Sequence, residues 1–170
     1  MDSLFHVDGK PFFSIGGQLN NSTSSDPALT EKAFKTCVGL GLNTVAAPVH
    51  WELFEKEEGA YDFAQIDMLM ELARRSGLRL VVLWFGTWKN GNSHYVPEWV
   101  KLQKERFLWA KANDGAEIRA LSPTCEETKK ADMRAFCELC GHIARNNADG
   151  CVIGIQIENE PGLIGAARDY

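Results

Sequence analysis

The chain has 170 residues, a formal net charge of -5, 45% hydrophobic and 24% charged residues, which is the composition of an ordinary globular protein. Its longest apolar run, residues 80–85, is far shorter than the roughly 18 residues of a membrane span. Lysine and arginine are scattered, so the charge pattern argues against a nucleic-acid partner. The first residues have no basic and apolar leader, so we expect a cytoplasmic protein with no signal peptide and no membrane partner. Length alone predicts one domain over residues 1–170.

The N-terminal third predicts a hairpin, a helix and a strand. The turn pair Asp8-Gly9 lies between two short apolar segments and predicts a β-hairpin over residues 5–13. Asp26-Pro27 is a typical helix start and Gly41 a typical helix end. Residues 42–49 then predict a buried strand, followed by a long loop over residues 50–62.

Helical and strand patterns continue to alternate in the rest of the chain. A second helix is predicted with Ile66, Leu69, Met70 and Ala73 on its buried face, followed by a strand over residues 78–85. A long excursion, residues 86–123, leads to a capping-box pattern at Thr124 to Glu127 and a third helix. That helix is predicted to bury Met133, Phe136, Cys137, Cys140 and Ile143, and residues 151–157 form the last strand.

The resulting order of strands and helices predicts an α/β fold with parallel strands joined by crossover helices. Both a doubly wound sheet and a (β/α)8 barrel have this order. The chain contains neither a G-x-G-x-x-G motif nor a P-loop, so a nucleotide-binding function is not expected.

Polar and aromatic residues are concentrated directly after the predicted strands. In a parallel barrel these positions share the C-terminal face, where active sites lie. Aromatic rings stack on the C–H faces of sugars, and amide and carboxylate groups bind hydroxyl groups, so the pattern favours a neutral carbohydrate ligand. The residues that we expect to line this face are Gln18, Asn20, Trp51, Trp88, Asn90, Asn159 and Glu160.

Glu160 is the strongest candidate for a catalytic residue. It follows an apolar strand, and we expect partial burial to raise its pKa, as a general acid at neutral pH requires. The alternative is a carboxylate that only caps the following turn. Glu52 and Glu158 are the remaining candidates for a second catalytic carboxylate. Glu158 is two residues from Glu160 and would share its face in a regular strand. The favoured alternative for Glu158 is a structural, hydrogen-bonding carboxylate in the barrel interior.

Several segments resemble known glycosidases in the same order along the chain. The segment Gln156 to Gly162 resembles the strand-four motif of retaining glycosidases built on (β/α)8 barrels. Residues 51–63, 84–90 and 95–100 resemble segments of family 35 and family 42 β-galactosidases, and residues 7–12 resemble their N-terminal hairpin. The resemblance covers nearly the whole chain.

The resemblance implies the N-terminal half, about four βα units, of a (β/α)8 barrel preceded by a short β-hairpin. It implies a retaining glycoside hydrolase that acts on β-linked sugars, with a galactoside or oligosaccharide as substrate. Glu160 would be the acid/base, and Asn159 would bind the sugar 2-hydroxyl group. A complete barrel needs about 250 residues, so the nucleophile is expected in a C-terminal part that these residues lack, and the 170-residue chain alone is expected to be inactive. No cofactor and no metal is implied, because two carboxylates fill both catalytic roles.

Two rival functions remain open from the sequence. One is an endoglycanase similar to family 5, for which Asn-Glu-Pro is also typical. The other is a non-catalytic, sugar-binding or assembly half-barrel; an open half-barrel exposes sheet edges, so self-association into a homo-oligomer is expected.

Four further features have a structural and a functional interpretation. Cys137-x-x-Cys140 with His142 suggests a metal site, but core packing is favoured because no second pair exists. His50 could line the site or be structural, and Trp99 and Trp109 could form a sugar platform or anchor the excursion. The acidic run of residues 55–58 is interpreted as a solvated loop.

Overall fold

The computed structural model describes residues 4–162. The chain forms two compact units. The first unit comprises Met1–Pro48, Ala64–Leu83 and His142–Gln156, and the second comprises Val49–Phe63, Trp84–Gly141 and the residues from Ile157 onward. Within the described residues no helix has the length and hydrophobicity needed to cross a membrane.

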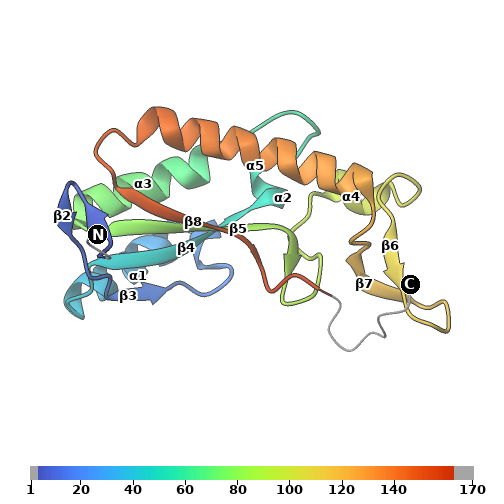
Figure 1. The fold of residues 1–170 in the computed structure, drawn as a ribbon, viewed down its shortest axis with the longest axis horizontal. Coiled ribbons are helices and arrows are strands. Elements are labelled where there is room, and N and C mark those ends of the chain that lie inside the picture. The colour runs from blue at the N-terminus through green and yellow to red at the C-terminus, as the bar shows by residue number, and fades with distance from the viewer. Residues whose placement is uncertain (1–3, 163–170) are drawn as a thin grey trace. The chain divides into compact units, whose positions relative to one another are not determined.

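The first unit begins with the predicted hairpin (Figure 1). Strand β1 (His6–Val7) pairs antiparallel with β2 (Lys10–Pro11). The turn residues Asp8 and Gly9 have φ values of 51° and 71°, the left-handed conformation that a two-residue hairpin turn needs. This prediction is confirmed.

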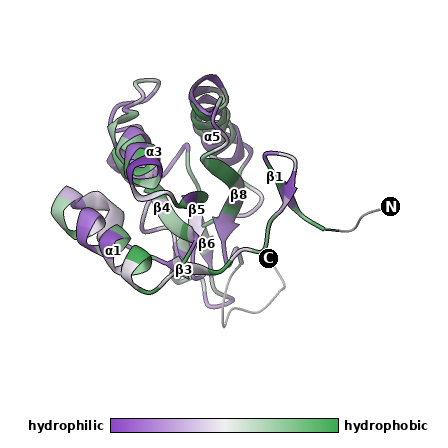
Figure 2. Cartoon of the chain, turned by 90° about the vertical axis from the view of Figure 1, so that its left-hand side faces the viewer, coloured by the Kyte–Doolittle hydropathy of each residue, from purple (hydrophilic) through white to green (hydrophobic). Residues whose placement is uncertain are grey.

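Two predicted helices lie side by side in the first unit (Figure 2). After a short 3-10 turn, η1 (Thr23–Ser25), helix α1 (Pro27–Gly39) begins where expected, because the Asp26 side chain accepts hydrogen bonds from the N–H groups of Ala28 and Leu29. Helix α3 (Ala64–Ser76) packs against α1 and buries the four residues predicted for it, Ile66, Leu69, Met70 and Ala73.

The main sheet has four strands in the order β3-β4-β5-β8: β3 (Gly16–Gln18), β4 (Thr44–His50), β5 (Arg79–Lys89) and β8 (Val152–Asn159). Strands β3 and β4 are parallel, with Gly16 opposite Thr44. The spatial order equals the chain order, whereas a doubly wound sheet reverses direction at a switch point. The strand order therefore favours the barrel over the doubly wound sheet.

The second unit contains regular structure where the sequence suggested loops. A short helix, α2 (Trp51–Phe54), begins directly after β4, and β5 extends to Lys89. The predicted excursion holds helix α4 (Glu98–Leu102) and an antiparallel hairpin of β6 (Trp109–Lys111) and β7 (Glu117–Leu121), which lie near the start of α5 in Figure 1. Trp99 anchors this region, because its Nε1 donates to the Glu55 carbonyl at 2.9 Å and its ring packs against Phe107.

The third predicted helix, α5 (Glu126–Asn146), forms, but its buried face is only partly the predicted one. Ile143 is buried as predicted, Phe136 and Cys140 are half-buried, and Met133 and Cys137 are exposed. The other buried positions are Thr128, Ala131, Asp132, Ala135 and Leu139. Ala131 and Ala135 are small, so the helix backbone can pack closely against the elements that cover this face. Hydrogen bonds satisfy the buried carboxylate of Asp132 on the same face. The predicted capping box is wrong as well, because the Glu127 carboxylate pairs with Lys130 and Arg106.

Candidate active site

The ends of strands β5 and β8 meet in the second unit and bring three predicted residues together. The N–H groups of Asn90 and Gly91 donate to the carbonyls of Asn159 and Glu160, both at 3.1 Å. The Lys89 ammonium donates to Asn159 Oδ1 at 2.6 Å and also to Asn90 Oδ1. Asn90, Asn159 and Glu160 therefore form one cluster.

Lys89, which the sequence analysis did not single out, holds this cluster. Its side chain is only 8% exposed, and its ammonium lies 5.1 Å from the centroid of the Phe85 ring. The Phe85 ring packs against Tyr95 and the buried His50, so His50 belongs to an aromatic cluster that contacts the Lys89 side chain through Phe85. A lysine at the end of an apolar strand was a visible signal, because a charge at such a position needs polar partners.

Glu160 is exposed in the described chain, so the burial expected for its carboxylate is not found. Its φ of 51° lies in the left-handed region, which is unusual for a residue other than glycine. The backbone bond from Gly91 holds this conformation. Glu160 thus stands at the end of β8 with its side chain accessible to a ligand.

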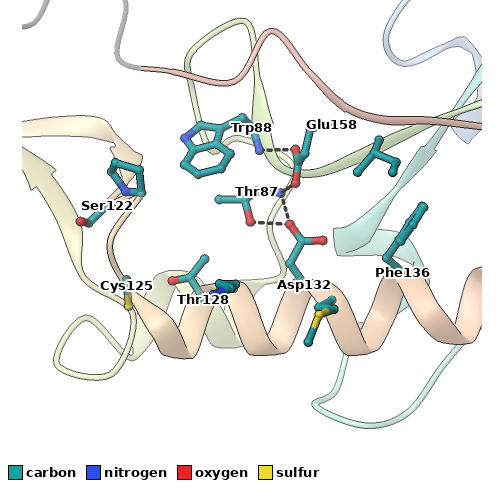
Figure 3. Close-up of a pocket in the computed structure, with 12 residues that line it drawn as sticks. Thr87, Trp88, Ser122, Cys125, Thr128, Asp132, Phe136 and Glu158 are labelled. Carbon is teal, nitrogen blue, oxygen red and sulfur yellow. Dashed lines mark hydrogen bonds between the residues drawn. The ribbon is translucent and has the colours of Figure 1, made fainter.

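The carboxyl group of Glu158 is half-buried and faces helix α5. Its Oε1 accepts from the Thr87 N–H at 2.8 Å and its Oε2 from the Trp88 N–H at 2.7 Å. Figure 3 shows Glu158 and Asp132 both turned toward Thr87. The expected common face of Glu158 and Glu160 in the barrel interior is wrong, because Glu158 has a φ of 61° and the strand alternation breaks there.

Asp132, on α5, is the second carboxyl group of this pair, and sequence reasoning missed it. Its Oδ2 accepts from the Thr87 N–H at 2.8 Å and from the Thr87 hydroxyl at 2.5 Å, and its Oδ1 accepts from Trp84 Nε1 at 2.7 Å. Gly86 makes room for it, because a Cβ there would lie 2.7 Å from both Asp132 oxygens. The only sequence signal was an acid one residue away from the predicted buried face.

The carboxyl pair keeps a proton at neutral pH. Burial, a hydrogen bond with Asp132 and the charge of Asp132 raise the pKa of Glu158 to about 10, although the N–H groups of Trp88 and Thr87 favour its charged form. Two carboxyl groups this close titrate as a pair and cannot both ionise at low cost. The folded protein therefore favours the protonated form of Glu158 near pH 7.

This protonation predicts a pH dependence of stability. The pKa of Glu158 is higher in the folded protein than its ordinary value of 4.5, so its contribution is complete below about pH 4.5 and is lost as the pH rises toward about 10. One such proton changes the free energy of unfolding by at most about 1.4 kcal/mol per pH unit. We expect the melting temperature of Glu158→Gln to fall less with rising pH than that of the wild type.

The matched control is Glu105→Gln, because Glu105 is an exposed acid of the same unit. Its melting temperature should follow the wild-type pH dependence. Parallel wild-type and Glu158→Gln curves between pH 5 and pH 9 would contradict this protonation of Glu158.

Trp88 lies on a pocket of about 340 Å³ beside this pair. The apolar part of the lining consists of Trp88, Pro123, Met133, Phe136 and Ile157. Figure 3 shows the Trp88 ring at the wall of this pocket. The structure thus places the Trp88 ring with residues of α5, and its predicted stacking on a sugar remains a prediction.

Trp51 corrects the sequence analysis, because its ring is fully buried and cannot stack on a sugar. Its Nε1 donates to Glu55 Oε2 at 2.7 Å, and the other Glu55 oxygen accepts from the Gly59 N–H at 2.7 Å. Glu55 is 1% exposed, and burial raises its pKa. The solvated loop expected for residues 55–58 is therefore wrong at its first residue.

Gln18 and Asn20 belong to the first unit. Gln18 ends β3 opposite Ala46, and Asn20 lines a shallow depression with Asn21 and Leu29. Their part in the sugar site stays a prediction.

The described residues contain no group of three or more His, Cys, Asp or Glu side chains arranged to hold a metal ion. Cys137 is exposed and Cys140 half-buried, while His142 lies 2.6 Å from Asp67. Packing on the helix surface and the hydrogen bond between His142 Nε2 and Asp67 Oδ1 account for these three residues. The prediction that Cys137 packs in the core is wrong, because its side chain is exposed.

Comparison with known proteins defines the class of fold first. The structure of an exo-β-1,4-mannosidase, Op5Man5, from Opitutaceae bacterium strain TAV5 superposes with a TM-score of 0.67 at 19% identity, over 94% of this chain and 27% of that protein. The fold is the N-terminal half of an α/β barrel, as the sequence predicted.

The family follows from the sequence comparison. Residues 4–170 match Glycosyl hydrolases family 35, and the chain belongs to this family. A β-galactosidase of Xanthomonas manihotis is 25% identical over 93% of the chain, and an exo-β-D-glucosaminidase of Pyrococcus horikoshii is 28% identical over 71%. The matches span 25% and 17% of those two proteins, so the chain corresponds to about a quarter of their length or less.

Proposed function

We propose that residues 1–170 form part of one catalytic domain of a retaining β-glycosidase and supply its acid/base, Glu160. The observation that carries this proposal is the cluster at the ends of β5 and β8, where an accessible Glu160 follows Asn159 and Lys89 fixes the Asn159 amide. Glu160 protonates the oxygen of the leaving group, and Asn159 binds the sugar 2-hydroxyl group. Membership of family 35 supports both roles.

A retaining enzyme also needs a nucleophilic carboxylate about 5–5.5 Å from the acid/base. Glu158 does not suit this role, because its two carboxyl oxygens accept from the N–H groups of Thr87 and Trp88 and it faces α5. Glu52 pairs with Lys101 at 3.2 Å on α2. We propose that the nucleophile lies in another part of the whole protein, so the 170-residue chain alone releases no sugar.

The proposed substrate is a terminal β-galactoside. A relative named as a β-galactosidase matches over 93% of the chain, which supports galactose. A second relative is named as an exo-β-D-glucosaminidase, so a terminal amino sugar is the second candidate.

The test uses the whole protein and 4-nitrophenyl β-D-galactoside, β-D-glucosaminide and β-D-mannoside as substrates. We expect the galactoside to have the highest kcat/KM, and NMR to show the β-anomer as the first product. A higher kcat/KM for the glucosaminide than for the galactoside would identify an amino sugar as the substrate and leave the proposed mechanism unchanged. Formation of the α-anomer first, or cleavage only inside a β-glucan or mannan chain, would contradict the proposal.

A further inference from the structure

We propose that Asp132 and Glu158 are positioning residues: their two carboxyl groups converge on the Thr87 N–H and together hold Asn159 and Glu160 in the orientation that catalysis requires. This inference rests on the proposed role of Glu160. It assigns a function to a pair that touches neither the substrate nor the reacting atoms.

The first step of the argument is the convergence of both carboxyl groups on one donor. The Thr87 N–H donates to Asp132 Oδ2 and to Glu158 Oε1, each at 2.8 Å. Two charged carboxylates at one N–H group would repel each other strongly in a buried site. A proton between them turns this repulsion into a hydrogen bond, in which a neutral acid donates to a carboxylate.

The second step is the fixed frame around the pair. Asp132 is held by Trp84 Nε1 and by the Thr87 hydroxyl, and both of these donors are buried. Position 86 carries no Cβ, and one would lie 2.3 Å from Trp84 Nε1. The strand β5 and the helix α5 therefore offer Glu158 a rigid partner.

The third step connects Glu158 to Glu160. Both residues have a positive φ, a strained conformation for residues other than glycine that persists only where the surrounding structure imposes it. The Glu158 carboxyl group accepts from two consecutive N–H groups of β5, and the N–H groups of Asn90 and Gly91 donate to the carbonyls of Asn159 and Glu160. The side chain of Glu158 thus anchors the twist that turns Asn159 toward Lys89 and leaves Glu160 accessible.

Three elements surround the pair. Strand β5 contributes uncharged donors, namely Trp84 Nε1, the Thr87 N–H and hydroxyl groups and the Trp88 N–H, and β8 contributes Glu158 itself. From α5 come Asp132 and Lys129, which lines the same pocket and pairs with Glu126 at 3.3 Å. Deprotonation of the pair would place two charges on the Thr87 N–H and release Glu158.

A double-mutant cycle in the whole protein tests the proposal. Glu158→Gln keeps the side chain neutral, but its amide cannot accept from both N–H groups, so one hydrogen bond is lost. We expect about a 10²-fold loss of kcat on an aryl glycoside with a poor leaving group, with KM changed less than about threefold, because a misplacement of about 1 Å has that effect. Asp132→Asn should act in the same direction, and Glu105→Gln, at an exposed acid of the same unit, should keep wild-type kinetics.

The decisive comparison is Glu158→Gln in the Glu160→Gln background. If Glu158 acts through Glu160, the second substitution adds less than about threefold to the first. A full additional 10²-fold loss, or wild-type kcat in Glu158→Gln alone, would overturn the positioning role. Concentrations of folded enzyme are taken from the thermal unfolding amplitude, so that poor folding is not counted as lost turnover.

Failure of the proposed function gives a different result. If Glu160→Gln itself leaves kcat unchanged, Glu160 is not the acid/base, and the inference falls with it. If Glu160→Gln is strongly impaired while Glu158→Gln is unaffected or additive, only the positioning role is refuted.

Discussion

Replacement of Glu160 by glutamine is expected to lower kcat of the whole protein by about 10²- to 10⁴-fold on glycosides with poor leaving groups, which is the usual worth of general acid catalysis. Glutamine keeps the size of the side chain but cannot deliver a proton. Because Glu160 is exposed at the end of β8 and its backbone is pinned by Gly91, the substitution should leave the fold intact. Steady-state kinetics on a series of aryl β-glycosides measures the effect.

The dependence on the leaving group identifies the role. A nitrophenolate leaves without much protonation, so the bond-cleavage step of the Glu160→Gln variant should be nearly normal with such substrates. The matched control is Glu105→Gln, an exposed acid of the same unit that should behave as wild type. An equal loss on good and poor leaving groups would show that Glu160 does not act as the acid.

The order of most helices and strands was predictable because local sequence patterns determine it. The helix α1 has an N-cap and a proline at its start, α3 has one apolar face, and the turn Asp8-Gly9 has the residue types that its dihedral angles demand. Polar residues after β5 and β8 also met as expected, because the ends of neighbouring strands must lie at one edge of a sheet.

The buried polar partnerships were not predictable, since each depends on a contact between distant residues. Asp132 reaches Thr87 across 45 positions, and Glu158 reaches it across 71. Strand alternation assigned Glu158 to the wrong side, because a positive φ at that residue reverses its direction. Neither the close approach at Gly86 nor the reversal has a signature in a single sequence.

Trp51 shows a related ambiguity, because an aromatic residue after a strand is equally suited to a ligand site and to a core. Whether its ring meets a sugar depends on α2, a helix of four residues that the sequence did not predict. This helix places the ring at 6.0 Å and 90° to that of Trp99, and brings its Nε1 to the Glu55 carboxyl group. The two interpretations give opposite results on substitution.

Substitution of Trp51 is therefore expected to reduce stability and to leave substrate binding unchanged. Trp51→Ala removes a fully buried ring and should cost about 3–5 kcal/mol. Trp51→Phe fills most of the space but removes the donor to the buried Glu55 carboxyl group, which should cost about 1–3 kcal/mol. Chemical denaturation measures both values.

Combined substitution of Trp51 and Glu55 separates the contribution of their hydrogen bond to stability from the contribution of ring packing. If the cost of Trp51→Phe arises from the carboxyl group that it leaves without its indole donor, then the same substitution in a Glu55→Gln background should cost less, because a neutral amide is easier to bury than a charged group. The KM of the folded variants should stay near the wild-type value. A raised KM with an unchanged free energy of unfolding would contradict this prediction and indicate that Trp51 contacts the sugar. Such contact would require α2 to move far enough to expose a ring that is buried among other aromatic rings.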